Sequence, residues 1–157
     1  MEIVLIYVGK SNSKWNIQAI EEYTKRLTHY IKFSSLMISD IKNSRTMSRE
    51  QIIKEEGKLI LNQISPSDMV VLLDEKGDNM TSKEFSIWLQ KIYLGSYKRL
   101  VFIIGGPFGF SEEVYRICKA KISLSKMTFT HDMARLFFIE QLYRAMTIIR
   151  GEQYHHD

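Results

Sequence analysis

Short runs of apolar residues alternate along the chain with longer segments in which apolar residues recur every three or four positions. The short runs are typical of buried strands, and recurrence at helical spacing is typical of helices with one buried face. The runs predict strands over residues 2–8, 33–38, 69–73, 100–104 and 121–124. The recurring pattern predicts helices over residues 15–31 and 48–64, after Thr81, after Ser111, and over 132–150.

Polar residues mark several boundaries between these elements. Thr81 is followed three positions later by Glu84, which is the capping-box pattern of a helix start. Ser111 and Asp132 are expected to cap the helices that they precede. Residues 77–79, Gly-Asp-Asn, predict a turn after a strand that ends near residue 74.

The alternation of strands and helices also predicts the fold class. Several of the strands are wholly apolar, which indicates an α/β fold with a mainly parallel sheet and helices on both faces. No linker, internal repeat or low-complexity segment interrupts the pattern. The chain has 157 residues and is expected to form a single domain over residues 1–157.

Composition limits the possible classes of protein. No apolar run approaches the roughly 20 residues of a membrane-spanning helix, and the first residues lack a secretory-signal pattern. The single cysteine excludes an internal disulfide, and two adjacent histidines near the end do not make a metal site. We therefore expect a cytoplasmic protein with no membrane partner and no metal. The net charge of +4 permits contact with nucleic acid without requiring it.

Two loops are candidates for ligand binding. The strand over residues 100–104 leads into residues 105–109, Gly-Gly-Pro-Phe-Gly, and then into a capped helix. Ligands of open α/β sheets bind beyond the carboxyl ends of strands, where glycines let the backbone approach them, although a purely structural turn remains an alternative. Residues 124–129 mix apolar and hydroxyl side chains, which suits adenine or a thioether. His131 is expected to be structural or solvent-facing.

The last helix and the residues after it form a third candidate region. Arg144 follows Glu140 by four positions, so an ion pair between them is expected. Tyr154 and His155 could stack on a base or hydrogen-bond to it, although a frayed and idle tail is the alternative.

Taken in order, these motifs resemble the RlmH family of 23S ribosomal RNA (pseudouridine-N3) methyltransferases, a branch of the SPOUT superfamily. The likeness covers essentially the whole chain. The residues that carry it are Val8-Gly9-Lys10, Glu56-Gly57, Leu72-Leu73-Asp74 with Gly77, residues 104–109, residues 124–129 with His131, residues 140–145 and residues 151–155.

The resemblance implies a C-terminal trefoil knot, a homodimer, and S-adenosylmethionine as the cofactor, bound by the knotted loops. It further implies that the substrate is a pseudouridine of large-subunit ribosomal RNA, methylated at N3 in the assembled ribosome. The cofactor-binding residues that it implies are Leu73, Gly105, Leu124, Ser125, Lys126, Met127, Thr128 and Phe129.

The reaction that the resemblance implies needs help from the protein, because N3 of pseudouridine is a poor nucleophile until its proton leaves. Our candidates are His155 as the base or proton relay, Arg144 to stabilise the developing anion, and Tyr154 to stack on the base or hydrogen-bond to it. Two positions differ from the common family pattern: Thr130 replaces a proline, and His156 replaces a lysine or arginine.

Three other functions remain as alternatives. The chain could be a knotted transfer RNA methyltransferase, or a non-catalytic ribosome-associated or RNA-binding factor that retains the fold. The third, a dinucleotide-dependent oxidoreductase, is disfavoured because the glycines do not follow the Gly-x-Gly-x-x-Gly spacing.

Overall fold

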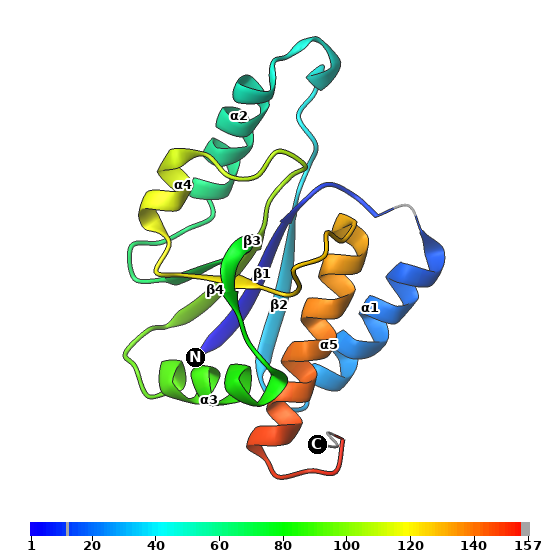
Figure 1. The fold of residues 1–157 in the computed structure, drawn as a ribbon, viewed down its shortest axis with the longest axis vertical. Helices are drawn as coiled ribbons and strands as arrows, with labels where there is room; N and C mark the ends of the chain where they lie inside the picture. Colours follow the sequence, from blue (N-terminus) through cyan, green and yellow to red (C-terminus); the bar gives the residue numbers. More distant parts are fainter. Residues whose placement is uncertain (12, 155–157) are drawn as a thin grey trace.

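The computed structural model describes residues 1–11 and 13–154 of the chain (Figure 1). Five strands form one sheet in the order β2-β1-β4-β3-β5, and every neighbouring pair is parallel. The strands are β1 (Glu2–Val8), β2 (Lys32–Ile38), β3 (Met69–Asn79), β4 (Arg99–Ile104) and β5 (Ala120–Ser123).

Helices cover both faces of the sheet, which confirms the predicted α/β class with a parallel sheet. The helices are α1 (Lys14–Leu27), α2 (Arg49–Leu61), α3 (Ser82–Tyr93), α4 (Glu112–Ile117) and α5 (His131–Ile149), and a 3-10 turn spans Ser44–Thr46. Side chains of α1, α3 and α5 pack with Ile3 and Leu5 of β1 on one face. Those of α2 and α4 pack with Val4 and Ile6 on the other face. Alternate residues of one buried strand thus serve two cores, because successive side chains of a strand point to opposite faces.

The prediction for the end of β3 was wrong. The strand does not end at residue 74 with a turn at 77–79 but continues to Asn79, after an irregular stretch between Leu73 and Asp78. Asn79 pairs with Ser123 of β5, and its amide donates a hydrogen bond to the Ser123 carbonyl oxygen over 3.1 Å. A Cβ at Gly77 would lie 2.6 Å from the backbone of β5, so this glycine permits close strand packing.

The predicted cap of α5 was also wrong by two positions. Thr130 is the N-cap, and its hydroxyl accepts a hydrogen bond of 3.3 Å from the backbone N–H of Met133. Asp132 lies inside the first turn, where its carboxylate binds Ser11 and Arg135 instead. The predicted caps of α3 and α4 are confirmed, with a complete capping box at Thr81 and Glu84.

Candidate functional site

A cavity of about 530 Å³ opens beyond the carboxyl ends of β3, β4 and β5. This volume lies within the range of about 300–1,000 Å³ that is common for small-molecule sites. Ile104 contributes the end of β4, Leu73 lies where the irregular stretch of β3 begins, and the two candidate loops form about half of the remaining wall. The arrangement agrees with the rule that ligands of open α/β sheets bind at this edge.

The structure brings together most of the residues that were expected to bind a cofactor. The cavity wall includes Leu73, Gly105, Leu124, Ser125, Met127, Thr128 and Phe129. Lys126 is the exception: its side chain is exposed and does not belong to the wall. Its neighbour Met127 is 77% exposed although it lines the cavity, so this part of the loop offers apolar surface to a ligand.

Hydrogen bonds within the 124–129 loop hold it in a turn. The Ser123 hydroxyl donates to the Ser125 carbonyl oxygen over 2.9 Å, and the Ser125 hydroxyl accepts from the backbone N–H of Met127 over 2.9 Å. At the end of the loop, the Phe129 ring packs on Phe137 of α5 with 4.8 Å between centroids. The loop thus combines apolar side chains with backbone polar groups at the cavity wall, which suits an adenine and a thioether.

The glycine turn is tightly packed from behind. A Cβ at Gly105 would lie 2.9 Å from the ring of Phe110, and one at Gly106 would lie 2.3 Å from a carboxylate oxygen of Glu56. Gly109 has a φ of +86°, which favours glycine. Packing therefore requires glycine at positions 105 and 106, and it leaves these two positions without side chains where they border the cavity.

Glu56 of α2 is the most unusual charged group near the cavity. The residue is 5% exposed, and its Oε2 has no hydrogen-bond partner among the described residues. Burial, and then the nearby charge of Asp40, raise the pKa of this carboxyl above its ordinary value. Sequence reasoning noted the Glu56-Gly57 pair only within the family resemblance. A charged residue on the buried side of an amphipathic helix was the signal that could have singled it out.

Replacing Glu56 by glutamine is expected to stabilise the protein at neutral and alkaline pH. The pKa of the Glu56 carboxyl is higher in the folded than in the unfolded protein, so ionising this group destabilises the fold. The loss of stability begins as pH rises above the unfolded-state pKa and is complete once pH exceeds the folded-state pKa. Glu56→Gln should therefore raise the free energy of unfolding by about 1 kcal/mol at pH 8 and by less at pH 4, measured by urea denaturation. Glu55→Gln, which removes an exposed ion pair with Lys58, is the control. An equal gain at both pH values would contradict this account.

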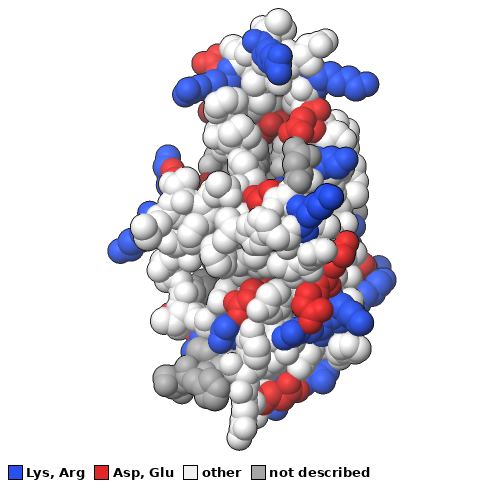
Figure 2. Space-filling model, turned by 90° about the vertical axis from the view of Figure 1, so that its right-hand side faces the viewer, with Lys and Arg blue, Asp and Glu red and all other residues white. Residues whose placement is uncertain are grey.

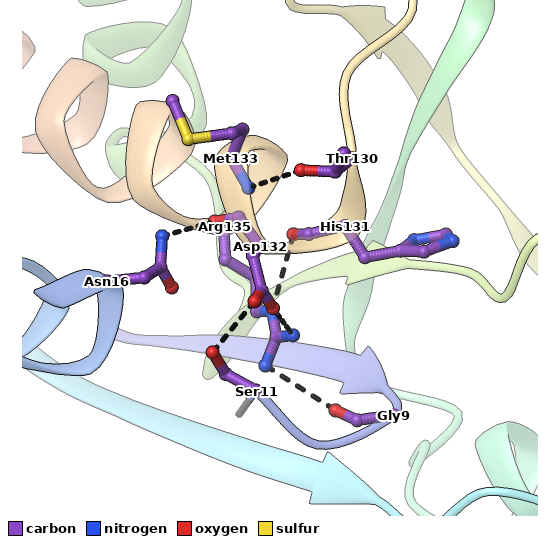
Figure 3. A network of polar contacts seen from close by, with 8 residues as sticks. All are labelled: Gly9, Ser11, Asn16, Thr130, His131, Asp132, Met133 and Arg135. Carbon is purple, nitrogen blue, oxygen red and sulfur yellow. Dashed lines mark hydrogen bonds and ion pairs between the residues drawn. The ribbon is translucent and has the colours of Figure 1, made fainter. Parts of the chain in front are cut away.

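A buried polar network joins the start of α5 to the segment after β1 (Figure 3). The guanidinium of Arg135 binds the carboxylate of Asp132 and the carbonyl oxygens of Gly9 and His131. The Ser11 hydroxyl donates to the same carboxylate over 2.8 Å, and Asn16 donates to the Asp132 carbonyl oxygen over 3.1 Å. Sequence reasoning missed this network, although the Asp-x-x-Arg spacing places both side chains on one helix face.

His131 lies between this network and the cavity. It is half-buried and lines the cavity, so it is neither a core residue nor fully solvent-facing. Burial, followed by the positive charge of Arg135, lowers the pKa of its imidazole. The ring is therefore neutral at physiological pH and can both donate and accept a hydrogen bond at the cavity wall.

Two of the three residues proposed to act on the substrate, Arg144 and Tyr154, lie outside the wall of this cavity. Arg144 forms the predicted ion pair with Glu140, with 2.5 Å between nitrogen and oxygen, and its guanidinium lies 4.7 Å from the ring centroid of Tyr154. The Tyr154 hydroxyl donates to the same carboxylate over 3.1 Å. Neither Arg144 nor Tyr154 lines the cavity, and His155 lies outside the described residues.

Neither a metal site nor a membrane span was found in the part of the chain that the structure describes. No group of three or more His, Cys, Asp or Glu side chains in residues 1–11 and 13–154 could hold a metal ion. No helix within those residues is long and apolar enough to cross a membrane.

Comparison with known proteins shows strong similarity along the whole chain. Residues 1–155 match a family described as predicted SPOUT methyltransferases. A Parabacteroides distasonis protein named ribosomal RNA large subunit methyltransferase H is 54% identical over 157 residues, with all of both chains covered. A Flavobacterium psychrophilum protein of the same name is also 54% identical, with 99% of both chains covered. A probable methylase family protein from Haemophilus influenzae has a similar fold, with a TM-score of 0.51 and 12% identity over 99% of this chain and 70% of that one.

Proposed function

Because the chain belongs to the SPOUT methyltransferase family, we propose that it transfers a methyl group from S-adenosylmethionine to RNA of the large ribosomal subunit. The observation that carries this proposal is the 54% identity, over the full length, to a protein named for that reaction. The cavity at the carboxyl edge of the sheet supports it, because it has a suitable size and lining for a nucleoside cofactor.

The cavity residues fit this cofactor. Leu73, Leu124 and Phe129 provide apolar surface, and the side-chain-free turn at Gly105 and Gly106 lets backbone groups approach a ligand. The cofactor supplies an electrophilic methyl group on a positively charged sulfur. The protein's own contribution is to hold the two reactants in line and to exclude water.

We propose N3 of a pseudouridine in 23S ribosomal RNA, in the assembled ribosome, as the target, and hence a cytoplasmic location. His155 would take the N3 proton, Arg144 would stabilise the developing anion, and Tyr154 would stack on the base or hydrogen-bond to it. Burial, followed by a hydrogen bond with Tyr23, raises the pKa of the Tyr154 hydroxyl, so this group remains a hydrogen-bond donor at neutral pH.

A homodimer would complete such a site. Arg144 and Tyr154 lie outside the cavity wall of their own chain, and a second copy could place its C-terminal residues at this cavity. The trefoil knot is a further proposal. It is supported by the path of the chain, because β5 pairs with β3 rather than β4 and residues 124–130 then lead back to α5, which packs on α1 and α3 (Figure 1).

Removal of residues 154–157 is expected to separate binding from turnover. The cofactor cavity contains none of these residues among those that the structure describes, so cofactor affinity measured by calorimetry should stay within about twofold. Turnover should fall at least tenfold, because general acid–base help typically contributes about 10²–10⁴-fold. Unchanged turnover in the truncated protein would remove the tail from the mechanism.

Methyl transfer from radiolabelled S-adenosylmethionine to assembled ribosomes, free subunits and bulk transfer RNA tests the proposed function. We expect label on a pseudouridine of the large subunit, identified by mass spectrometry. Label on transfer RNA alone would instead identify a transfer RNA methyltransferase. Ribosome binding without any cofactor binding would favour a non-catalytic RNA-binding factor.

A further inference from the structure

The connection between β2 and α2 projects from one end of the molecule and carries exposed positive charge (Figure 1). We call Lys42, Arg45 and Arg49 the basic tip. All three side chains are exposed, and Figure 2 shows Lys and Arg side chains at this end, with acidic side chains among them. In the described residues, none of the three forms an ion pair with an acidic side chain.

The start of α2 does not need this charge for helix capping. Arg49 is the first residue of α2, where the helix dipole already creates positive potential and disfavours a cation. The preceding Ser48 satisfies the helix end with a complete capping box, so the arginine is not needed as a cap. The tip therefore presents three cations to an external anion, with the exposed acidic residues Asp40 and Glu50 beside them in the sequence.

Arg49 connects the tip to the cofactor cavity. Its guanidinium lies 5.2 Å from the centroid of the Phe108 ring, and both residues line the cavity. Phe108 belongs to the glycine turn and is 37% exposed. An exposed aromatic ring beside an arginine at the mouth of a cavity is a suitable stacking surface for an unpaired base.

We propose that the basic tip binds the phosphates of the RNA strand next to the methylated nucleotide, and that Arg49 and Phe108 contact a flanking base. This proposal rests on the proposed function, because the target base must reach the cavity that Arg49 and Phe108 line. RNA is favoured over an acidic protein because cations and an exposed aromatic ring occur together, and phosphate contacts and base stacking use both.

The double variant Lys42→Glu/Arg45→Glu tests the tip without changing the cavity wall, since neither residue lines it. The matched control is Lys91→Glu/Lys98→Glu, which makes the same charge change on α3 and before β4, away from the tip. Binding of ribosomal subunits and of protein-free 23S RNA is measured across a salt series. Cofactor affinity and thermal unfolding are measured in parallel to verify folding.

We expect the tip variant to bind RNA at least tenfold more weakly than the control. The slope of log K against log salt should flatten by about 0.7–0.9 for each phosphate that the tip no longer neutralises.

Arg49→Gln should raise KM for RNA while its thermal unfolding remains that of the wild type. Equal binding by the tip and control variants would overturn the inference. So would a tip variant that binds protein-free RNA normally but subunits weakly, because a ribosomal protein would then be the partner. If the wild-type chain methylates no ribosomal RNA, the proposed function itself fails.

Discussion

Gly106→Ala is expected to weaken cofactor binding strongly and to destabilise the fold. The added Cβ would lie 2.3 Å from a carboxylate oxygen of Glu56, whose side chain is buried. Either the buried carboxylate or the glycine turn would have to shift, and overpacking of this kind costs about 1–3 kcal/mol, occasionally more. We expect a loss of about 3 kcal/mol in urea denaturation and at least tenfold weaker binding of S-adenosylmethionine in calorimetry.

A second substitution tests whether the clash with Glu56 causes the loss of stability and of cofactor binding in Gly106→Ala. Glu56→Ala removes the carboxylate that the new Cβ would strike, so Gly106→Ala/Glu56→Ala should be more stable than the sum of the single changes implies. It should also recover part of the cofactor affinity. If the two effects simply add, Glu56 does not constrain the glycine turn.

Arg135→Met is the second change with a large expected effect. It would leave the Asp132 carboxylate without its cation and the Gly9 carbonyl oxygen without its donor. Removing one partner of a buried ion pair costs about 3–5 kcal/mol, and the lower end applies because Asp132 is partly exposed. Denaturation should show a loss of about 3 kcal/mol, with weaker cofactor binding because α5 begins directly after the 124–129 loop.

Two further variants test whether the unpaired Asp132 carboxylate causes the loss of stability in Arg135→Met. Arg135→Met/Asp132→Asn removes both charges and should recover a large part of the stability. Arg135→Lys keeps the charge but not the planar guanidinium that reaches Asp132, Gly9 and His131 together, so it should lie between wild type and Arg135→Met. A loss below about 1 kcal/mol in Arg135→Met would show that the network contributes little.

The parts of the fold that were predicted correctly are those fixed by local chemistry. The apolar runs of β1 and β4 and the capping box of α3 depend on neighbours in the sequence. The far end of β3 depends on β5, more than forty positions away, and its Gly-Asp-Asn residues have turn propensity that this pairing overrides. The same applies to Asp132, whose capping role passes to Thr130 because Ser11 and Arg135 bind its carboxylate.

In the candidate site, too, some features follow from local sequence and others depend on how distant elements pack. The glycine turn and the 124–129 loop follow buried strands directly, so their place at the cavity could be predicted from the order of elements. Glu56 reaches the turn only because α2 packs on that face of the sheet. The separation of Arg144 and Tyr154 from the cavity could not be predicted, because it depends on how α5 and the tail pack against α1.

The polar network around Arg135 also has a consequence for the order of folding. It joins Gly9 and Ser11 to residues more than 120 positions later, so it closes a loop that contains nearly the whole sheet. Contacts of such high sequence separation carry the entropy cost of closing a long loop, and we expect this network to form after the sheet has brought its parts together. The network should therefore be absent from the folding transition state, and its bonds then slow unfolding without speeding folding. The ligand cavity beside the network would then be completed late in folding. How long the cavity persists in the native protein would depend on the rate at which these few hydrogen bonds break.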